Sequence, residues 1–273
     1  MPRHFVQSML ALALAAWSAG ASAQERSYVY TRESAVLEAG TTELDWWSTF
    51  RLGRQRYFSR LDGRLGLERG LSKGFEAGLY WNFSSQTADV VDDPVTGDIV
   101  RASSSELAGA SLEASYQLTD AVADAVGSAL QVFATLGTRQ SEVGVRLIAD
   151  RQLGRLKLAG NVNGALGLEP LRGASGTEVH SSFVLEPALA AGYRLGEAVS
   201  LSLELRAPLG LAGDADSSTL FGGPVLSVAQ HGYWAALGVQ PQLVAFSGQS
   251  PDSSLDLTSH ERVEVRLLAG FLL

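Results

Sequence analysis

Apolar side chains occupy every second position along most of the chain after residue 41. In the first such stretch Leu44, Trp46, Phe50 and Leu52 share one parity, and Glu, Asp and Arg occupy positions between them. A period of two is that of a β-strand with one apolar and one polar face. In the five clearest stretches no charge breaks the apolar face. This absence matters in a bilayer, where a lipid-facing Arg or Lys at the midplane costs about 2–4 kcal/mol.

The alternation predicts twelve strands, and each is about as long as a tilted strand needs to cross a bilayer, or somewhat longer. Their expected ranges are 42–53, 56–69, 74–86, 104–118, 128–138, 141–152, 155–168, 178–194, 198–208, 219–229, 232–247 and 259–273. Glu106 is an exception by parity, and we interpret it as a strand-end residue that lies above the lipid.

A soluble β-sandwich would show the same alternation, so the lengths of the connections are needed to choose. With the N-terminal end in the periplasm, four of the outer connections are long, at 87–103, 169–177, 209–218 and 248–258. Most inner turns are short, with 119–127 as the exception. Long outer loops and short periplasmic turns are typical of bacterial barrels. We therefore predict an all-β fold: a closed antiparallel transmembrane β-barrel of about twelve strands over residues 42–273.

The two ends of the chain indicate export to the outer membrane of a Gram-negative bacterium. Residues 1–23 have a polar start, an apolar stretch and a final Ala-Ser-Ala, which is the pattern of a cleaved signal peptide. Residues 24–41 are polar, and we expect either a periplasmic arm or a segment inserted into the lumen. The last expected strand alternates up to Leu273. We expect this strand to be recognised by the barrel-assembly machinery and the outer face of the barrel to contact outer-membrane lipid.

Composition narrows the possible partners. The net charge is −8 and there is no cysteine, so we expect no nucleic-acid partner, which would need a basic surface, and no disulfide. The acidic outer loop 86–103 fits no known calcium-loop spacing. We expect neither a metal ion nor a cofactor.

The polar face of the predicted strands would line the lumen with charges of both signs. Lys157, Arg194, Glu204 and Arg262 share this inward parity. The sixteen candidate residues for a selectivity or bracing network are Glu43, Asp45, Arg51, Arg60, Asp62, Arg64, Glu68, Glu76, Glu113, Glu142, Arg146, Asp150, Glu186, Arg206, Glu264 and Arg266. Such charges either select a solute in a polar conduit or pair across the lumen and brace it.

Three functions remain open at this point. The first is passage or uptake of small solutes, hydrophobic ones among them. The second is a non-transport barrel that acts through its outer loops. The third and weakest is an outer-membrane hydrolase built on His180 or His260 with Asp252 or Asp256, but the chain has no G-x-S-x-G or H-E-x-x-H motif. We predict that the protein is not an enzyme.

A resemblance to a known family supports this interpretation. The stretch 28–34, Tyr-Val-Tyr-Thr-Arg-Glu-Ser, is followed by Leu-Glu-Ala-Gly-Thr-Thr-Glu-Leu at 37–44, and then by residues 57–62 and 67–71. These motifs resemble the opening of a family of proteobacterial outer-membrane barrels that are uncharacterised or loosely called transporters, some of them linked with phenol degradation. The resemblance implies a barrel with a signal peptide, and it implies no established substrate and no catalytic residues.

Overall fold

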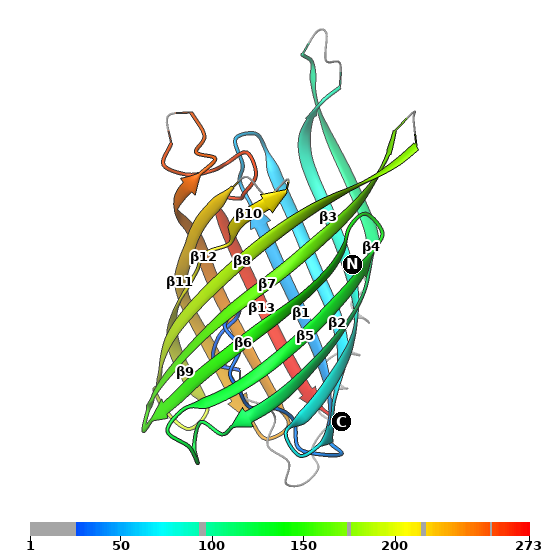
Figure 1. Cartoon of the computed structure of the whole chain (residues 1–273). Helices are drawn as coiled ribbons and strands as arrows, with labels where there is room; N and C mark the ends of the chain where they lie inside the picture. The colour runs from blue at the N-terminus through cyan, green and yellow to red at the C-terminus, as the bar shows by residue number, and fades with distance from the viewer. Residues whose placement is uncertain (1–25, 93–96, 174–175, 214–216, 252) are drawn as a thin grey trace, which may run out of the picture.

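A computed structural model describes residues 26–92, 97–173, 176–213, 217–251 and 253–273. The expected signal peptide lies outside these residues. The described chain forms one antiparallel sheet that closes into a barrel (Figure 1). Its strands are β1 (Thr42–Leu52), β2 (Phe58–Ser72), β3 (Phe75–Val91), β4 (Ile99–Thr119), β5 (Gly127–Gly137), β6 (Ser141–Leu153), β7 (Leu156–Gly173), β8 (Gly176–Arg194), β9 (Val199–Arg206), β10 (Leu209–Gly213), β11 (Ser218–Gln230), β12 (Tyr233–Ser247) and β13 (Val263–Leu272). No helix among these residues is long and apolar enough to span a membrane.

The sheet closes because β1 pairs with β2 on one side and with β13 on the other. Strands β9 and β10 both lie between β8 and β11, so they are two parts of one strand position. Pro208 lies at the break between them, where its ring nitrogen has no hydrogen to donate. Thirteen segments therefore make a barrel of twelve strand positions, which confirms the predicted all-β barrel.

The two ends of the barrel differ, as Figure 1 shows. The start of β1, the end of β13 and most short turns lie at the lower end. At the upper end the hairpins β3–β4 and β7–β8 project beyond the other strands. The stretches 87–103 and 169–177, expected as loops, are mostly paired strand, with Val91 opposite Ile99 and Gly173 opposite Gly176. Sequence alternation missed this extension because a hairpin that extends into water needs no apolar face.

The parity of Glu106 suggested that it lies on the apolar face, above the lipid. The structure places it elsewhere. The register of β3 and β4 shifts so that Asn82 opposes Gly109 and Phe83 opposes Leu107. One extra residue, Ala108, therefore forms a β-bulge that reverses the parity of the strand beyond it. Glu106 opposes Ser84, which is buried, so the carboxylate belongs to the inner face.

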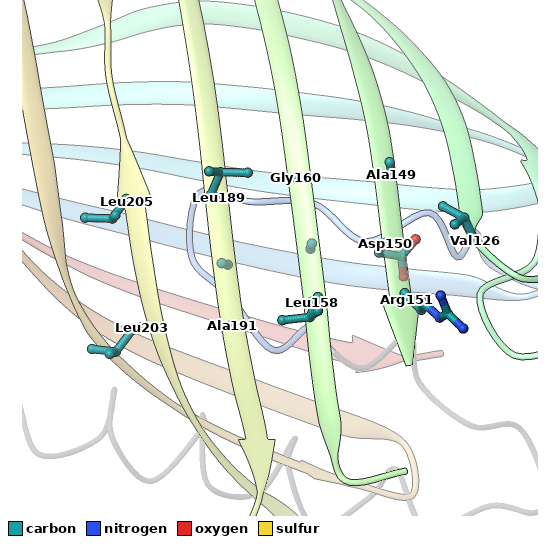
Figure 2. Close-up of a pocket in the computed structure, with 12 residues that line it drawn as sticks. Val126, Ala149, Asp150, Arg151, Leu158, Gly160, Leu189, Ala191, Leu203 and Leu205 are labelled. Carbon is teal, nitrogen blue, oxygen red and sulfur yellow. The ribbon is translucent and has the colours of Figure 1, made fainter. Parts of the chain in front are cut away.

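The exterior of the barrel is apolar. Leucines of the predicted outward parity are exposed, among them Leu67 (40%) and Leu203 (67%). A hollow of about 540 Å³ lies on this outer surface between Leu158, Leu189 and Leu205, where small neighbours leave space (Figure 2). An apolar outer surface of this kind suits acyl chains better than water.

The packed core lies inside the barrel. The buried apolar side chains Trp47, Val225, Trp234 and Leu268 come from four different strands and converge on Val29, which precedes β1. The segment before the barrel thus fills the lumen at this level.

Candidate functional site: the lumen and its N-terminal arm

Residues 26–41, called the arm below, lie within the lower part of the lumen. Tyr28, Val29 and Leu37 are at most 4% exposed. The hydroxyl of Tyr28 donates to the carbonyl of Lys157 at the lower end of β7 (2.9 Å). At its end the arm joins the barrel, because Gly40 donates to the carbonyl of Gly70 (2.8 Å). The sequence left two locations open for this segment, the periplasm and the lumen, and residues 26–41 lie in the lumen.

One carboxylate of the barrel wall holds the centre of the arm. Glu204, on β9, accepts hydrogen bonds from the backbone N–H groups of Val29 (3.3 Å), Tyr30 (2.9 Å) and Thr31. Glu204 is 1% exposed. Three successive amides bound by one buried carboxylate satisfy donors that would otherwise cost free energy inside the barrel.

Further inward polar residues bind the arm in the same way. Each accepts a hydrogen bond from an arm backbone N–H: Asn161 from Arg32 (2.5 Å), Asp150 from Ser34 (3.1 Å) and Glu76 from Leu37 (2.9 Å). The arm has no regular secondary structure, so side chains of β3, β6, β7 and β9 replace the partners that a strand or helix would supply.

Two arginines of the arm neutralise carboxylates of the wall. Arg26 lies 3.1 Å from Glu68 and 3.6 Å from Asp45, and Arg32 lies 2.9 Å from Glu113. All of these side chains are at most 10% exposed. Breaking such a buried pair by removing one partner is costly, because the other charge remains buried alone.

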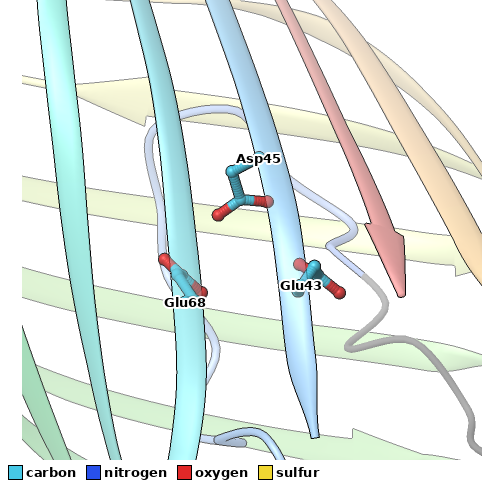
Figure 3. A group of neighbouring side chains, drawn as sticks. All are labelled: Glu43, Asp45 and Glu68. Carbon is cyan, nitrogen blue, oxygen red and sulfur yellow. The ribbon is translucent and has the colours of Figure 1, made fainter. Parts of the chain in front are cut away.

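Glu43, Asp45 and Glu68 form a compact acidic group beneath the arm (Figure 3). One carboxylate oxygen from each lies within 4.8 Å of the others. The positive charge near them comes from Arg26 and from Arg32, which lies 3.5 Å from Glu68, and Trp234 donates to Glu43 (3.0 Å). Side chains of the protein thus supply positive charge and a hydrogen-bond donor to the three carboxylates. These carboxylates belong to the ion-pair network of the arm.

Trp47 lies at the centre of the cationic groups. Its ring centroid lies 4.6 Å from the guanidinium of Arg64, 5.0 Å from that of Arg26 and 5.1 Å from that of Arg266. Tyr80 lies beside it at 6.0 Å. Desolvated cation–π contacts of this kind are worth about 2 kcal/mol or more. Trp47 thus packs both in the lumen and against the arm.

None of the sixteen candidate residues is exposed. Six are buried, namely Glu43, Asp45, Glu68, Glu76, Arg206 and Glu264, and the other ten are half-buried. The candidates near the lower end of the barrel contact the arm. Those nearer the upper end pair mainly with other residues of the barrel wall: Arg51 contacts Asp62 and Glu264, Arg64 contacts Glu113, and Arg206 contacts Glu186 and Glu264. Arg146 instead donates to Gln131 (2.8 Å).

Sequence reasoning missed several partners. Asn161 has no charge, and Glu261 has the parity of the apolar residues in the expected strand 259–273, so neither belonged to a set chosen by charge and parity. The arm arginines were visible in the sequence, but nothing placed the arm. One signal for the position of the arm was present in the sequence. Near the lower end of the lumen, inward carboxylates outnumber the arginines of the wall.

Two cavities lie on opposite sides of the packed level. The vestibule, about 870 Å³, lies at the lower end between the arm and the wall, with Glu33, Lys73, Asp150 and Arg194 in its lining. The chamber, about 310 Å³, lies above Trp47. Between them the inward side chains of Tyr80, Glu204 and Trp234 are at most 1% exposed, so this level of the lumen is densely packed.

The loop between β12 and β13 covers part of the upper end. Leu257 and Asp256 are buried, and the carbonyl of Leu257 accepts from the backbone of Gln55 (2.9 Å). Burial raises the pKa of Glu261 to about 7, and its hydrogen bond with Glu264 adds to the effect. Burial also lowers the pKa of His260.

The residues considered for hydrolysis are used differently here. His260 packs edge-on against Phe221 at 5.9 Å. One oxygen of Asp256 accepts from the backbone of Thr258 and Ser259, both at 3.0 Å, so this carboxylate shapes the loop. His180 opposes Glu169 in the β7–β8 hairpin, and Asp252 lies outside the described residues.

The closed barrel, its apolar exterior and its charged interior define an outer-membrane β-barrel protein. Residues 20–159, about half of the chain, match a family described as a family of unknown function (DUF6662), and the protein belongs to that family. No curated protein matches the sequence.

Solved structures with a similar fold are outer-membrane proteins. The COG4313 outer membrane channel from Pseudomonas putida F1 has a TM-score of 0.62 at 13% identity, with 90% of this chain and 100% of that one covered. The KdgM porin has a TM-score of 0.50 at 10% identity, with 84% and 98% covered. The translocator domain of the autotransporter NalP from Neisseria meningitidis has a TM-score of 0.50 at 11% identity, with 98% and 94% covered. At these identities the likeness establishes the fold.

Proposed function

We propose that the protein is an outer-membrane channel for small polar solutes, held closed by its N-terminal arm and opened when the arm leaves the lumen. The observation that carries this proposal is the seal itself. The arm is joined to the wall by hydrogen bonds and ion pairs, and cavities lie above and below it. Noncovalent contacts of this type can be released and remade.

The lining of the lumen supports passage of polar solutes. Twelve strands enclose more space than the filled eight-stranded barrels and less than the open barrels of 16–18 strands. The wall around the arm carries carboxylate and amide groups, such as Glu68, Gln131 and Asn161. Without the arm these groups would face water, which they tolerate. The charged lining favours polar solutes over the hydrophobic ones that the sequence had also allowed.

A non-transport barrel is the second candidate, and one observation favours it. The ion pairs at the arm are almost fully buried, as expected for a brace that never opens. The link to phenol degradation suggested by the resemblance has no counterpart in the lumen chemistry and is not part of the proposal.

A reversible lock on the arm distinguishes the two candidates. The chain contains no cysteine, so a designed pair is the only thiol pair present. A Cβ added at Gly238 would lie 2.6 Å and 3.3 Å from the two methyl carbons of Val29, which suits the Cβ separation of about 3.5–4.5 Å of a disulfide. The variant Val29→Cys/Gly238→Cys is tested in planar bilayers, alone and with Glu204→Ala, which weakens the seating of the arm.

We expect the reduced Glu204→Ala lock variant to conduct and the oxidised one to be silent, with conduction restored by a reductant. The two single-cysteine variants are the matched controls and should not respond to oxidant. Conduction that is unchanged by oxidation would show that the arm is not the gate. Silence of the reduced Glu204→Ala variant in correctly folded barrels would favour the non-transport candidate.

A further inference from the structure

The charged groups that line the chamber above the arm are mainly cationic. Arg51, Arg60, Arg64 and Arg266 line it, with Asp62 as the acidic residue among its lining side chains. They come from β1, β2 and β13. Arg60 and Arg51 are 41% and 31% exposed, so solvent reaches the chamber.

Three of the four arginines have carboxylate partners, and Arg266 has none among the described residues. Asp62 is shared between Arg51 (2.7 Å) and Arg60 (2.6 Å), Arg51 also contacts Glu264, and Arg64 lies 2.7 Å from Glu113. Arg266 lies over the rings of Tyr30 (4.2 Å) and Trp47 (5.1 Å), and no carboxylate among the described residues lies within 4.0 Å of it. Its positive charge has no direct counter-charge in the chamber lining, and positive charge in a cleft raises the local concentration of anions.

Three residues that line the chamber carry a buried donor without a hydrogen-bond partner in the described part of the chain: Nε of Arg64, Nε of Arg266 and Nε1 of Trp47. Buried donors without a partner are rare in native proteins and costly. The remaining guanidinium donors of the lining arginines form forks that suit two-oxygen anions.

We propose that the chamber is a binding site for a small oxyanion, of the carboxylate or phosphate type, that enters from the upper end of the barrel. This inference rests on the proposed function and names the class of solute for it. The volume of about 310 Å³ is at the lower end of the range of about 300–1,000 Å³ for ligand pockets, so the solute is small. Asn82, Ser111 and Thr135 form a hydrogen-bonded row on the chamber wall that offers neutral polar contacts.

Isothermal titration of the purified full chain in detergent tests the proposal without requiring conduction. The probes are succinate, inorganic phosphate and neutral succinamide at low and high salt. We expect succinate or phosphate to bind, with weaker binding at high salt, and succinamide not to bind. Arg266→Gln should lower the affinity about tenfold, or about 1.4 kcal/mol, because Arg266 is the arginine without a carboxylate partner.

The control is Arg101→Gln, which removes the same charge from the projecting β3–β4 hairpin, outside the chamber lining. It should leave the affinity unchanged. Equal binding of succinamide, no binding of either anion, or equal losses in the two variants would overturn the proposal. Because the assay measures binding to the closed barrel, these outcomes are independent of whether the lock variant conducts.

Discussion

Replacing Glu204 with alanine should release the centre of the arm. The carboxylate accepts from three successive backbone amides, those of Val29, Tyr30 and Thr31. A hydrogen bond to a charged group contributes about 1.5–3 kcal/mol. The three bonds share one carboxylate, and water can enter the space that the side chain vacates. We therefore expect the arm to be seated less firmly by about 3 kcal/mol, which is less than the roughly 4.5 kcal/mol that three independent bonds would lose at the least.

Hydrogen–deuterium exchange of the arm amides measures this change directly. A loss of about 3 kcal/mol corresponds to exchange that is faster by somewhat more than a hundredfold. Glu204→Gln keeps an acceptor without the charge, and its exchange rates should be intermediate. Glu106→Ala removes an inner-face carboxylate near the upper end and should leave the arm amides protected. Unchanged protection of residues 29–31 in Glu204→Ala would refute the reasoning, because their donors would then be held by other groups.

Two further predictions concern the wall and the upper loop. Gly109→Ala should destabilise the barrel by more than about 2 kcal/mol, because φ is +138° and a Cβ would lie 2.1 Å from the carbonyl oxygen of Leu136. The loss should appear as a lower temperature of the heat-induced gel shift, and an unchanged temperature would contradict the bulge. Glu261 has a pKa raised to about 7, so its stabilising contribution is complete below its unfolded pKa near 4.5 and is lost as pH rises through 7. Loop amides at 248–262 should exchange faster at pH 8 than at pH 5.5 after correction for intrinsic rates, and Glu261→Gln should remove that difference.

The strands could be predicted from sequence because lipid imposes a strict requirement on them. Every second residue must be apolar across the bilayer, and this leaves a readable period of two. Glu106 shows where the rule ends: one inserted residue, Ala108, reverses parity, and alternation cannot locate a bulge before the partner strand is known. The sequence also predicted that a strand ends at Pro208 and that 209–218 is a connection, whereas the strand position continues beyond the proline as β10.

The candidate site was predictable only in part. Parity selected sixteen charged residues, and none of them is exposed in the structure. Their partners were expected across the lumen, but several are in the arm, because Arg26 and Arg32 reach Glu68 and Glu113. The arm has no periodic pattern, and its conformation follows from hydrogen-bond acceptors on distant strands. Such contacts cannot be inferred from the arm's own residues.

The position of the arm constrains the order in which the protein assembles. The arm precedes every strand, yet the residues that bind it are separated from it by up to 234 positions, as with Tyr30 and Glu264. Its final seat does not exist until β13 has joined the sheet, so the segment made early must wait for partners made late. During that wait it is surrounded by water. A polar segment such as this one can remain soluble meanwhile, whereas an apolar plug of the same length would invite aggregation.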